Sequence, residues 1–321
     1  MIGSVSSITY ESVASVLQVL LIVVLGPLLV GFMAKVKARA EGRIGAPVTQ
    51  VLRDLRKLLT KERLHARHAS VVLALAPLVI VGATTVAVAI SPLVTTRPLL
   101  GQSADILVIV YLLLTGSVAS ALAGLDAGTA FGGMGSSRAM TIGALSEPAL
   151  LVAVIALSIQ SGTSNLPGIV SATMNHPDWV SGPSRLLALV ALVIVVIAET
   201  GRLPVDNPST HLELTMIHEA MVLEYAGPEL ALVTLGAAMR LGLLFALISN
   251  LFFPWGIARN FSYVALLVGS AALVAKTIVI ALGIALVEIR SAKLRLFRLP
   301  ELLAGGFVLS VLAVITGLVT R

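Results

Sequence analysis

The sequence predicts an all-α integral membrane protein with about eight transmembrane helices, an interfacial amphipathic helix and a charged cytoplasmic or intramembrane helix. Apolar residues make up 57% of the 321 positions and charged residues 12%, and the mean hydropathy is +1.02. This composition lies outside the range of soluble domains. Apolar runs recur evenly along the chain, so residues 1–321 are expected to form one membrane domain.

Each apolar run is expected to be a helix, because a backbone that crosses lipid must satisfy its own hydrogen bonds and the runs lack the alternation of barrel strands. The first run is followed by a basic segment rather than a cleavage site, which predicts a retained span and not a signal peptide. The expected spans are 14–34, 70–90, 104–124, 140–160, 184–200, 227–250, 262–288 and 301–320.

Basic residues gather in the segments that follow the first and seventh expected spans. Both segments follow odd-numbered spans and share one side, which the positive-inside rule predicts to be cytoplasmic, with both termini outside. This distribution explains the net charge of +6 without nucleic acid. The basic residues are Lys35, Lys37, Arg39, Arg43, Arg53, Arg56, Lys57, Lys61, Arg63 and Arg67, then Arg290, Lys293, Arg295 and Arg298.

The first basic segment also contains an amphipathic pattern. Apolar residues from Val48 to Leu59 recur at helical spacing, and Arg53, Arg56 and Lys57 lie on the opposite side. The pattern predicts a helix at the membrane interface. Its spacing alone favours lipid anchoring over a surface for a partner protein.

Several ionisable residues fall inside expected spans, among them Glu147, Arg240 and Lys276. Charges in a membrane are costly and persist where they are paired, hydrated or used. Any one of them could form a structural salt bridge. Because both signs are present, the set favours a hydrated polar pathway.

The densest group of charges lies at residues 199–229. Glu199, Arg202 and Asp206 alternate with two prolines, and Pro208 is suited to open a helix that runs through Glu213 and Glu224. These last two glutamates are about three helical turns apart and are expected to share a face. Sheltered carboxylates can exchange protons through water. The alternative is a solvated loop helix.

Several other functions are excluded or weakened by missing residues. His218-Glu219 begins like a zinc-protease helix, but Val222 stands where the second histidine is needed. The glycine-rich stretch 131–137 lacks the Lys-Ser/Thr of a phosphate-binding loop and is expected to form a tight turn. The chain has no cysteine, so it supplies no thiolate for a metal or an iron–sulfur cluster.

Four stretches together resemble one family: 199–225, then 39–47 with 57–62, then 124–148, and finally Lys276-Thr277 with Glu288-Ile289-Arg290. They are similar to the membrane subunit that joins the two arms of respiratory complex I, called subunit 1 in mitochondria. They are more similar to the equivalent subunit of group 4 energy-converting [NiFe] hydrogenases, such as formate hydrogenlyase subunit 4. The stretch 201–209 departs from the usual complex I motif, and the segment between Glu213 and Glu224 is longer by about one helical turn. Both departures resemble the hydrogenase branch.

The resemblance implies a multi-pass subunit of a prokaryotic inner membrane that has no redox centre of its own and couples redox chemistry to proton or ion translocation. The implied partners are a hydrogenase large subunit with the [NiFe] centre, an Fe–S small subunit and antiporter-like membrane subunits. The expected proton pathway comprises Glu147, Glu199, Asp206, Glu213, Glu219, Glu224, Arg202, Arg240 and Lys276. The expected docking residues are Arg39, Arg43, Arg53, Arg56, Lys57, Asp126, Arg138 and Arg290.

Three alternatives stay open at the level of sequence. The first is a complex I subunit that contributes to a quinone site. The second is a stand-alone ion transporter, against which the chain shows no inverted repeat. The third is a structural anchor, in which the acids would tolerate neutral replacement.

Overall fold

The computed structural model describes residues 2–64, 69–206, 217–291, 294 and 298–319, and these residues form helices joined by short connections. Two short 3₁₀ turns cover Gly101–Ser103 and Pro177–Ser181. The helices are α1 (Ile2–Ala40), α2 (Gln50–Leu59), α3 (Val71–Ile90), α4 (Ile106–Asp126), α5 (Ala130–Ser161), α6 (Leu166–Asn175), α7 (Pro183–Glu199), α8 (His218–Val222), α9 (Gly227–Phe252), α10 (Tyr263–Arg290) and α11 (Leu299–Val319).

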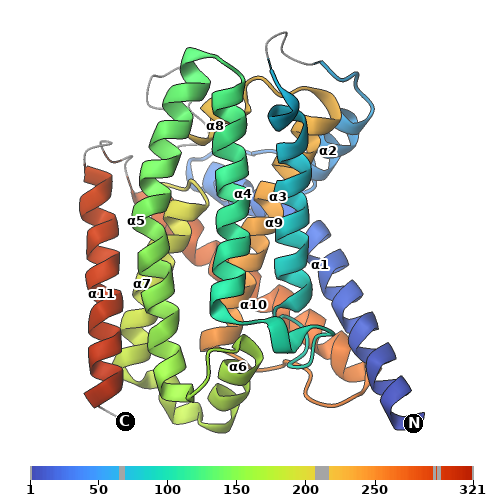
Figure 1. Ribbon diagram of the computed structural model, residues 1–321, viewed down its shortest axis with the longest axis vertical. Coiled ribbons are helices and arrows are strands. Elements are labelled where there is room, and N and C mark those ends of the chain that lie inside the picture. The colour runs from blue at the N-terminus through green and yellow to red at the C-terminus, as the bar shows by residue number, and fades with distance from the viewer. Residues whose placement is uncertain (1, 65–68, 207–216, 292–293, 295–297, 320–321) are drawn as a thin grey trace.

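The expected fold class, an all-α membrane protein, is confirmed. Seven helices in the described part are long and apolar enough to cross a membrane: α1, α3, α4, α5, α9, α10 and α11. The remaining expected span is α7, which has 17 residues and is about 25 Å long at the usual helical rise. It packs between α5 and α11 and runs in the same direction as the bundle (Figure 1).

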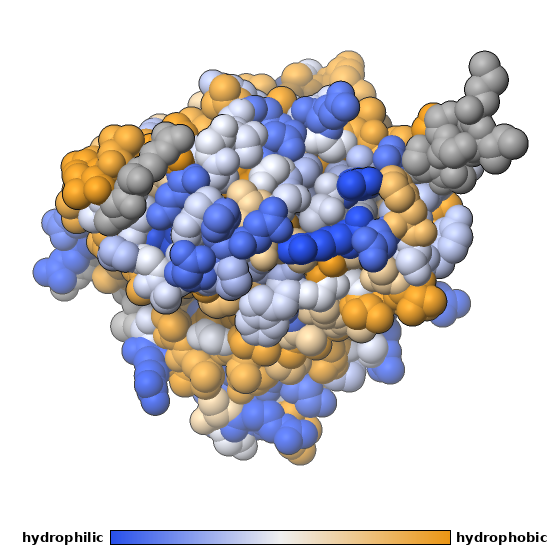
Figure 2. Space-filling view, turned by 90° about the horizontal axis from the view of Figure 1, so that it is seen from below, coloured by the Kyte–Doolittle hydropathy of each residue, from blue (hydrophilic) through white to orange (hydrophobic). Residues whose placement is uncertain are grey.

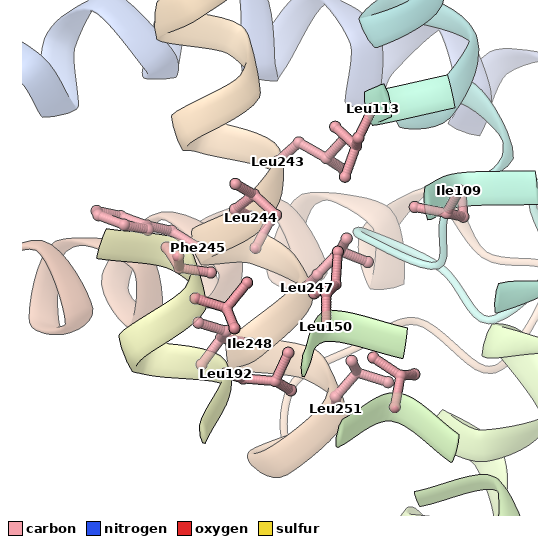
Figure 3. Close-up of a cluster of buried hydrophobic side chains, with 14 of the residues drawn as sticks. Ile109, Leu113, Leu150, Leu192, Leu243, Leu244, Phe245, Leu247, Ile248 and Leu251 are labelled. Carbon is pink, nitrogen blue, oxygen red and sulfur yellow. The ribbon is translucent and has the colours of Figure 1, made fainter. Parts of the chain in front are cut away.

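Helix α9 is the centre of the bundle. Its most apolar window is 67% buried, against 28% for α10 and for α11. Figure 3 shows why: Leu113 of α4, Leu150 of α5 and Leu192 of α7 surround a row of α9 side chains that includes Leu247. The outer helices instead present exposed leucine and valine, as expected for surfaces that face lipid.

The two ends of the bundle differ. Helix α2 and the C-terminal ends of α1 and α10 lie at one end, which we call the basic end, because it carries the exposed residues Arg39, Arg53 and Arg290. Both chain termini lie at the opposite end, here called the terminal end (Figure 1). Figure 2 views the terminal end, where hydrophilic residues cross the middle of the face and apolar residues flank it.

The predicted amphipathic helix is confirmed as α2. Leu55 is buried, whereas Arg53, Arg56 and Lys57 are exposed. The helix packs against α1 and α9, so its apolar side contacts the protein itself.

Two local predictions were wrong. The long helix expected from Pro208 to Glu224 is not found over its described part, where α8 begins at His218 and ends at Val222. Glu224 therefore lies beyond the helix; Glu213 belongs to residues 207–216, outside the described residues. The glycine-rich stretch 131–137 is not a turn but the start of α5. A Cβ on its Gly135 would meet the carbonyl oxygen of Ile217 at 2.9 Å, so these glycines let α5 approach its neighbours closely.

Candidate functional site

A cavity of about 250 Å³ lies at the middle of the bundle and extends toward the basic end. Its wall comes from α3, α4, α5, α7, α8, α9 and the loop 201–206. Most of the wall is apolar. The ionisable side chains among its lining residues are Glu147, Glu199, Asp206, His218 and Arg240.

An ion pair between Glu199 and Arg240 forms the polar centre of this cavity. The Glu199 carboxylate accepts from the Arg240 guanidinium and from the hydroxyl of Ser146. Arg240 Nη1 also donates to Ser117 Oγ at 2.6 Å. The two charged side chains are only 9% and 15% exposed. Because these four residues lie on α4, α5, α7 and α9, the pair ties four helices together at one depth.

The pair also solves a local electrostatic problem. Glu199 is the last residue of α7, where a negative charge faces the negative end of the helix dipole. The positive charge of Arg240, on α9, offsets both the charge of Glu199 and the negative end of the α7 dipole. Breaking a buried pair by removing one partner usually costs several kcal/mol, because the remaining charge has no compensation.

Glu147 is the second acid of this group. It follows Ser146 on α5, lines the same cavity, and interacts through its charge with Glu199 and Arg240. The group thus contains two carboxylic acids and one guanidinium. Such a coupled set can bind or release a proton as a unit, since its members share one electrostatic balance.

Asp206 forms the wall of the cavity at its basic end. Its side chain is buried, and its Oδ2 accepts from the backbone N–H of His218 at 3.2 Å. The chain reaches this position through a tight turn after α7, in which Gly201 takes a left-handed conformation with φ +58°. Glycine adopts that conformation without a steric cost.

Arg202 does not accompany these acids as expected. Its guanidinium lies 3.7 Å from the buried carboxylate of Glu288 on α10, which also binds the ammonium of Lys37 on α1 at 2.8 Å. Burial holds the pKa of Arg202 below its usual value, and the negative charge of Glu288 offsets only part of this effect. This three-residue group links the loop that carries Asp206 to the basic ends of α1 and α10.

Lys276 is also separate from the cavity. Its ammonium donates to Asn250 Oδ1 at 2.6 Å and to the carbonyl oxygens of Phe253 and Trp255 at 3.0 Å each. These atoms lie at the last turn of α9 and just beyond it, toward the terminal end. Glu219 and Glu224 are described but are not among the residues that line the cavity.

The expected docking residues lie mostly on one exposed surface. Arg39, Arg43, Arg53, Arg56, Lys57 and Arg290 are all exposed at the basic end. Asp126 instead has a structural contact, since its Oδ2 accepts the backbone N–H groups of Ser70 at 2.8 Å and Leu73 at 3.1 Å, at the start of α3. Arg138 is only partly exposed, near the start of α5.

Ser117, Ser146 and Glu288 were not among the predicted site residues. Ser117 and Ser146 give no signal of their own, because serine is common in spans and only the packing of the helices shows what it faces. Glu288 did give a signal, as an acid at the end of an apolar span. Its partners could not be assigned without the fold.

The residues that the structure describes contain no group of three or more His, Asp or Glu that could hold a metal ion. The ionisable side chains that line the cavity can form ion pairs with one another and can bind and transfer protons.

Comparisons with known proteins place this architecture. The chain is 29% identical over 305 residues to hydrogenase-4 component C of Escherichia coli (strain K12), covering 95% of each chain. It is 30% identical over 300 residues to formate hydrogenlyase subunit 4 of the same organism, covering 94% of this chain and 96% of the relative. A subunit of the NADH-quinone oxidoreductase of Rickettsia prowazekii (strain Madrid E) is 27% identical over 204 residues, which cover 63% of this chain and 59% of the relative.

A solved structure, that of the membrane-bound sulfane sulfur reductase, an archaeal respiratory membrane complex, contains a chain with the same fold. The TM-score is 0.83 at 22% sequence identity, and the match covers 95% of this chain and 98% of the other. The model of the family described as NADH dehydrogenase matches residues 12–319. The resemblance seen in the sequence motifs is confirmed: the chain belongs to the NADH dehydrogenase family, with close relatives among the hydrogenase-4 and formate hydrogenlyase subunits.

Proposed function

We propose that this chain is the membrane subunit of a multisubunit energy-converting complex of the hydrogenase or formate hydrogenlyase type, and that it couples a redox reaction in its partners to proton or ion translocation. The observation that carries the proposal is the nearly buried ion pair of Glu199 and Arg240, with the partly exposed Glu147 beside it, in a cavity that extends toward the basic end. An anchor would not need two acids around one guanidinium at the centre of the bundle.

The coupling follows from charge. When both carboxylates are ionised, the group of two acids and one base has a net charge of −1. An electron that arrives on a partner at the basic end changes the potential felt by this group through a low-dielectric interior. The proton occupancy of Glu147 and Glu199 then follows the redox state. Asp206 and His218, which line the cavity between this group and the basic end, provide the next proton-binding positions.

The exposed basic residues of α1, α2 and α10 form the docking surface. They bind the hydrogenase large subunit and the Fe–S small subunit, which carry the [NiFe] centre and the iron–sulfur clusters. The lateral faces contact lipid and antiporter-like membrane subunits. The protein lies in the prokaryotic inner membrane, with the basic end cytoplasmic, as the positive-inside rule predicts.

A quinone site is the second candidate. The largely apolar wall of the cavity, with Arg240 and His218 as polar groups, favours a ligand with an apolar body and a carbonyl head. Its volume of about 250 Å³ is small for a cavity that holds a whole cofactor, since such sites usually measure about 300–1,000 Å³. We therefore favour proton coupling by the acids of this chain over a quinone site.

The proposal is tested by replacing Glu199→Gln and Glu147→Gln in the assembled complex. Each change removes an ionisable group but keeps its shape, so electron transfer in detergent is expected to persist while ion translocation in sealed vesicles falls at least about tenfold. The matched control is Asp178→Asn, an exposed acid at the terminal end, which should leave both unchanged. Full translocation in both glutamine variants would contradict the proposal.

A further inference from the structure

Beyond the cavity, the bundle has a layered order toward the terminal end. Along α9, Arg240 lies in the cavity, Leu244 and Leu247 follow in an apolar layer, and the carbonyl oxygen of Leu251 in the last turn accepts from the buried Arg185. Leu247 is about 10 Å beyond Arg240 at the helical rise. The same order recurs on α5, where Glu147 is followed by Leu150 and then by Gln160, a partner of Arg185.

The apolar layer separates the cavity from the terminal end. A small second cavity of about 30 Å³ lies within it and is lined only by leucine, isoleucine and valine side chains of α4, α5, α6 and α9. Leu113 borders both cavities, so the two are adjacent. Figure 3 shows Leu113, Leu150 and Leu247 among the side chains that close this level. Water needs polar partners to occupy so small a space, and apolar cavities of this kind stay dry.

Two cations lie beyond the apolar layer, Arg185, which is buried, and Lys276, which is partly buried. Arg185, on α7, is fully buried and donates to Gln160 at 2.9 Å, to Thr173 at 2.8 Å and to the carbonyl oxygen of Leu251 at 3.4 Å. Its guanidinium also lies over the ring of Trp179 at 5.6 Å. Among the described residues, none of its contacts is a carboxylate.

Lys276 is the second cation of this level. Its three partners are an amide oxygen and two carbonyl oxygens, and in the described part of the chain they include no carboxylate. Both cations thus sit at the negative end of the α9 dipole, which stabilises them there. A fixed positive charge next to a narrow pathway repels hydronium and other cations, as basic residues do in selective pores.

From these two levels we infer that the cavity exchanges water and protons at the basic end only, and that the chain is sealed toward the terminal end by the apolar layer and by the cations Arg185 and Lys276. A proton held at Glu147 or Glu199 therefore leaves toward the basic end or sideways into a neighbouring subunit, never straight across this chain. The inference rests on the proposed function, because it concerns the protons that the cavity is proposed to hold. It also reassigns Lys276 from proton carrier to part of the barrier.

The chain contains no cysteine, so single cysteines can report water access without removing native ones. The full chain without its partners is reconstituted in vesicles of both orientations and treated with a charged, membrane-impermeant thiol reagent. Ala237→Cys reports the cavity wall, and Leu247→Cys the apolar layer. Thr60→Cys and Gln102→Cys, both at exposed positions, mark the basic and terminal ends.

We expect Ala237→Cys to react from the side of Thr60→Cys at least about ten times faster than from the side of Gln102→Cys, because a charged reagent pays a large cost to enter the apolar layer. Leu247→Cys should stay unreactive from both sides. Reaction of Ala237→Cys at similar rates from the two sides, or of Leu247→Cys from the terminal side, would overturn the inference.

A second measurement keeps the test independent of labelling. Leu247→Asn places a polar group in the dry layer, and Leu247→Met keeps it apolar at similar volume. Passive proton entry into vesicles should rise severalfold for Leu247→Asn alone, whereas equal leak in both variants would contradict the seal. Neither readout needs coupled turnover. The labelling and leak results therefore test the seal even if the glutamine variants contradict the proposed coupling, and the glutamine variants test the coupling even if the seal is absent.

Discussion

At the scale of single residues, the position of Arg240 decides the electrostatics of the cavity. One guanidinium binds Glu199 and Ser117 and feels the charge of Glu147. Because it is nearly buried, its loss leaves acids without a countercharge in a low-dielectric interior.

Arg240→Leu is therefore expected to destabilise the purified chain by about 3–5 kcal/mol. The double variant Arg240→Leu with Glu199→Gln should recover a large part of this loss, since it removes the uncompensated charge as well. Thermal unfolding of the four proteins of the cycle in detergent gives the coupling energy. Additive losses would show that the pair contributes little.

The sequence alone could suggest that charged residues gather inside the membrane. It could not show which of them meet in the cavity. Glu147 and Arg240 stand out in the sequence as charges within apolar runs, and both line the cavity. Lys276 has the same signature and lies elsewhere, because the partner of a buried charge depends on helix register and packing. Arg202 likewise pairs with Glu288, far along the chain.

At the scale of helices, close packing of α1 on α9 holds the central helix in place. Gly26 makes this possible, since a Cβ at that position would overlap the carbonyl oxygen of Ala238. Small residues at helix contacts in membranes allow such approach. The depth of Arg240 and Leu247 relative to α4 and α5 depends on it.

Gly26→Val is expected to destabilise the chain by about 1–3 kcal/mol, as overpacking of a tight contact does. Gly82→Val is the matched control, because Gly82 is also in a span, on α3, and has open space around it. Chemical denaturation in mixed micelles measures both. Equal effects of the two substitutions would rule out the close α1–α9 contact as a determinant of stability.

The spans themselves were predictable because lipid requires long apolar helices, and hydropathy measures that requirement directly. The end of α8 at Val222 and the extra helix α6 were not. Both lie outside the long spans, where contacts with other helices override local preference, as Asp206 does when it accepts the N–H of His218.

At the scale of the whole molecule, the two ends have different properties. The basic end carries exposed cations and the Asp206 side of the cavity, whereas an apolar layer, the buried Arg185 and the partly buried Lys276 lie between the cavity and the terminal end. A redox partner at the basic end would therefore act on the acids through the protein interior, where charges are screened less than in bulk water. The relatives of this chain are named as a component of hydrogenase-4 and as subunits of formate hydrogenlyase and NADH-quinone oxidoreductase.

The central claim is that Glu147 and Glu199 change their proton occupancy when the partners change redox state. Infrared difference spectroscopy of the assembled complex, reduced minus oxidised, measures this directly as a band from a protonated carboxyl group. We predict that the band is present in the parent complex and in Asp178→Asn, and that it is lost or shifted in Glu147→Gln and Glu199→Gln. A spectrum that is the same in all four proteins would contradict the account.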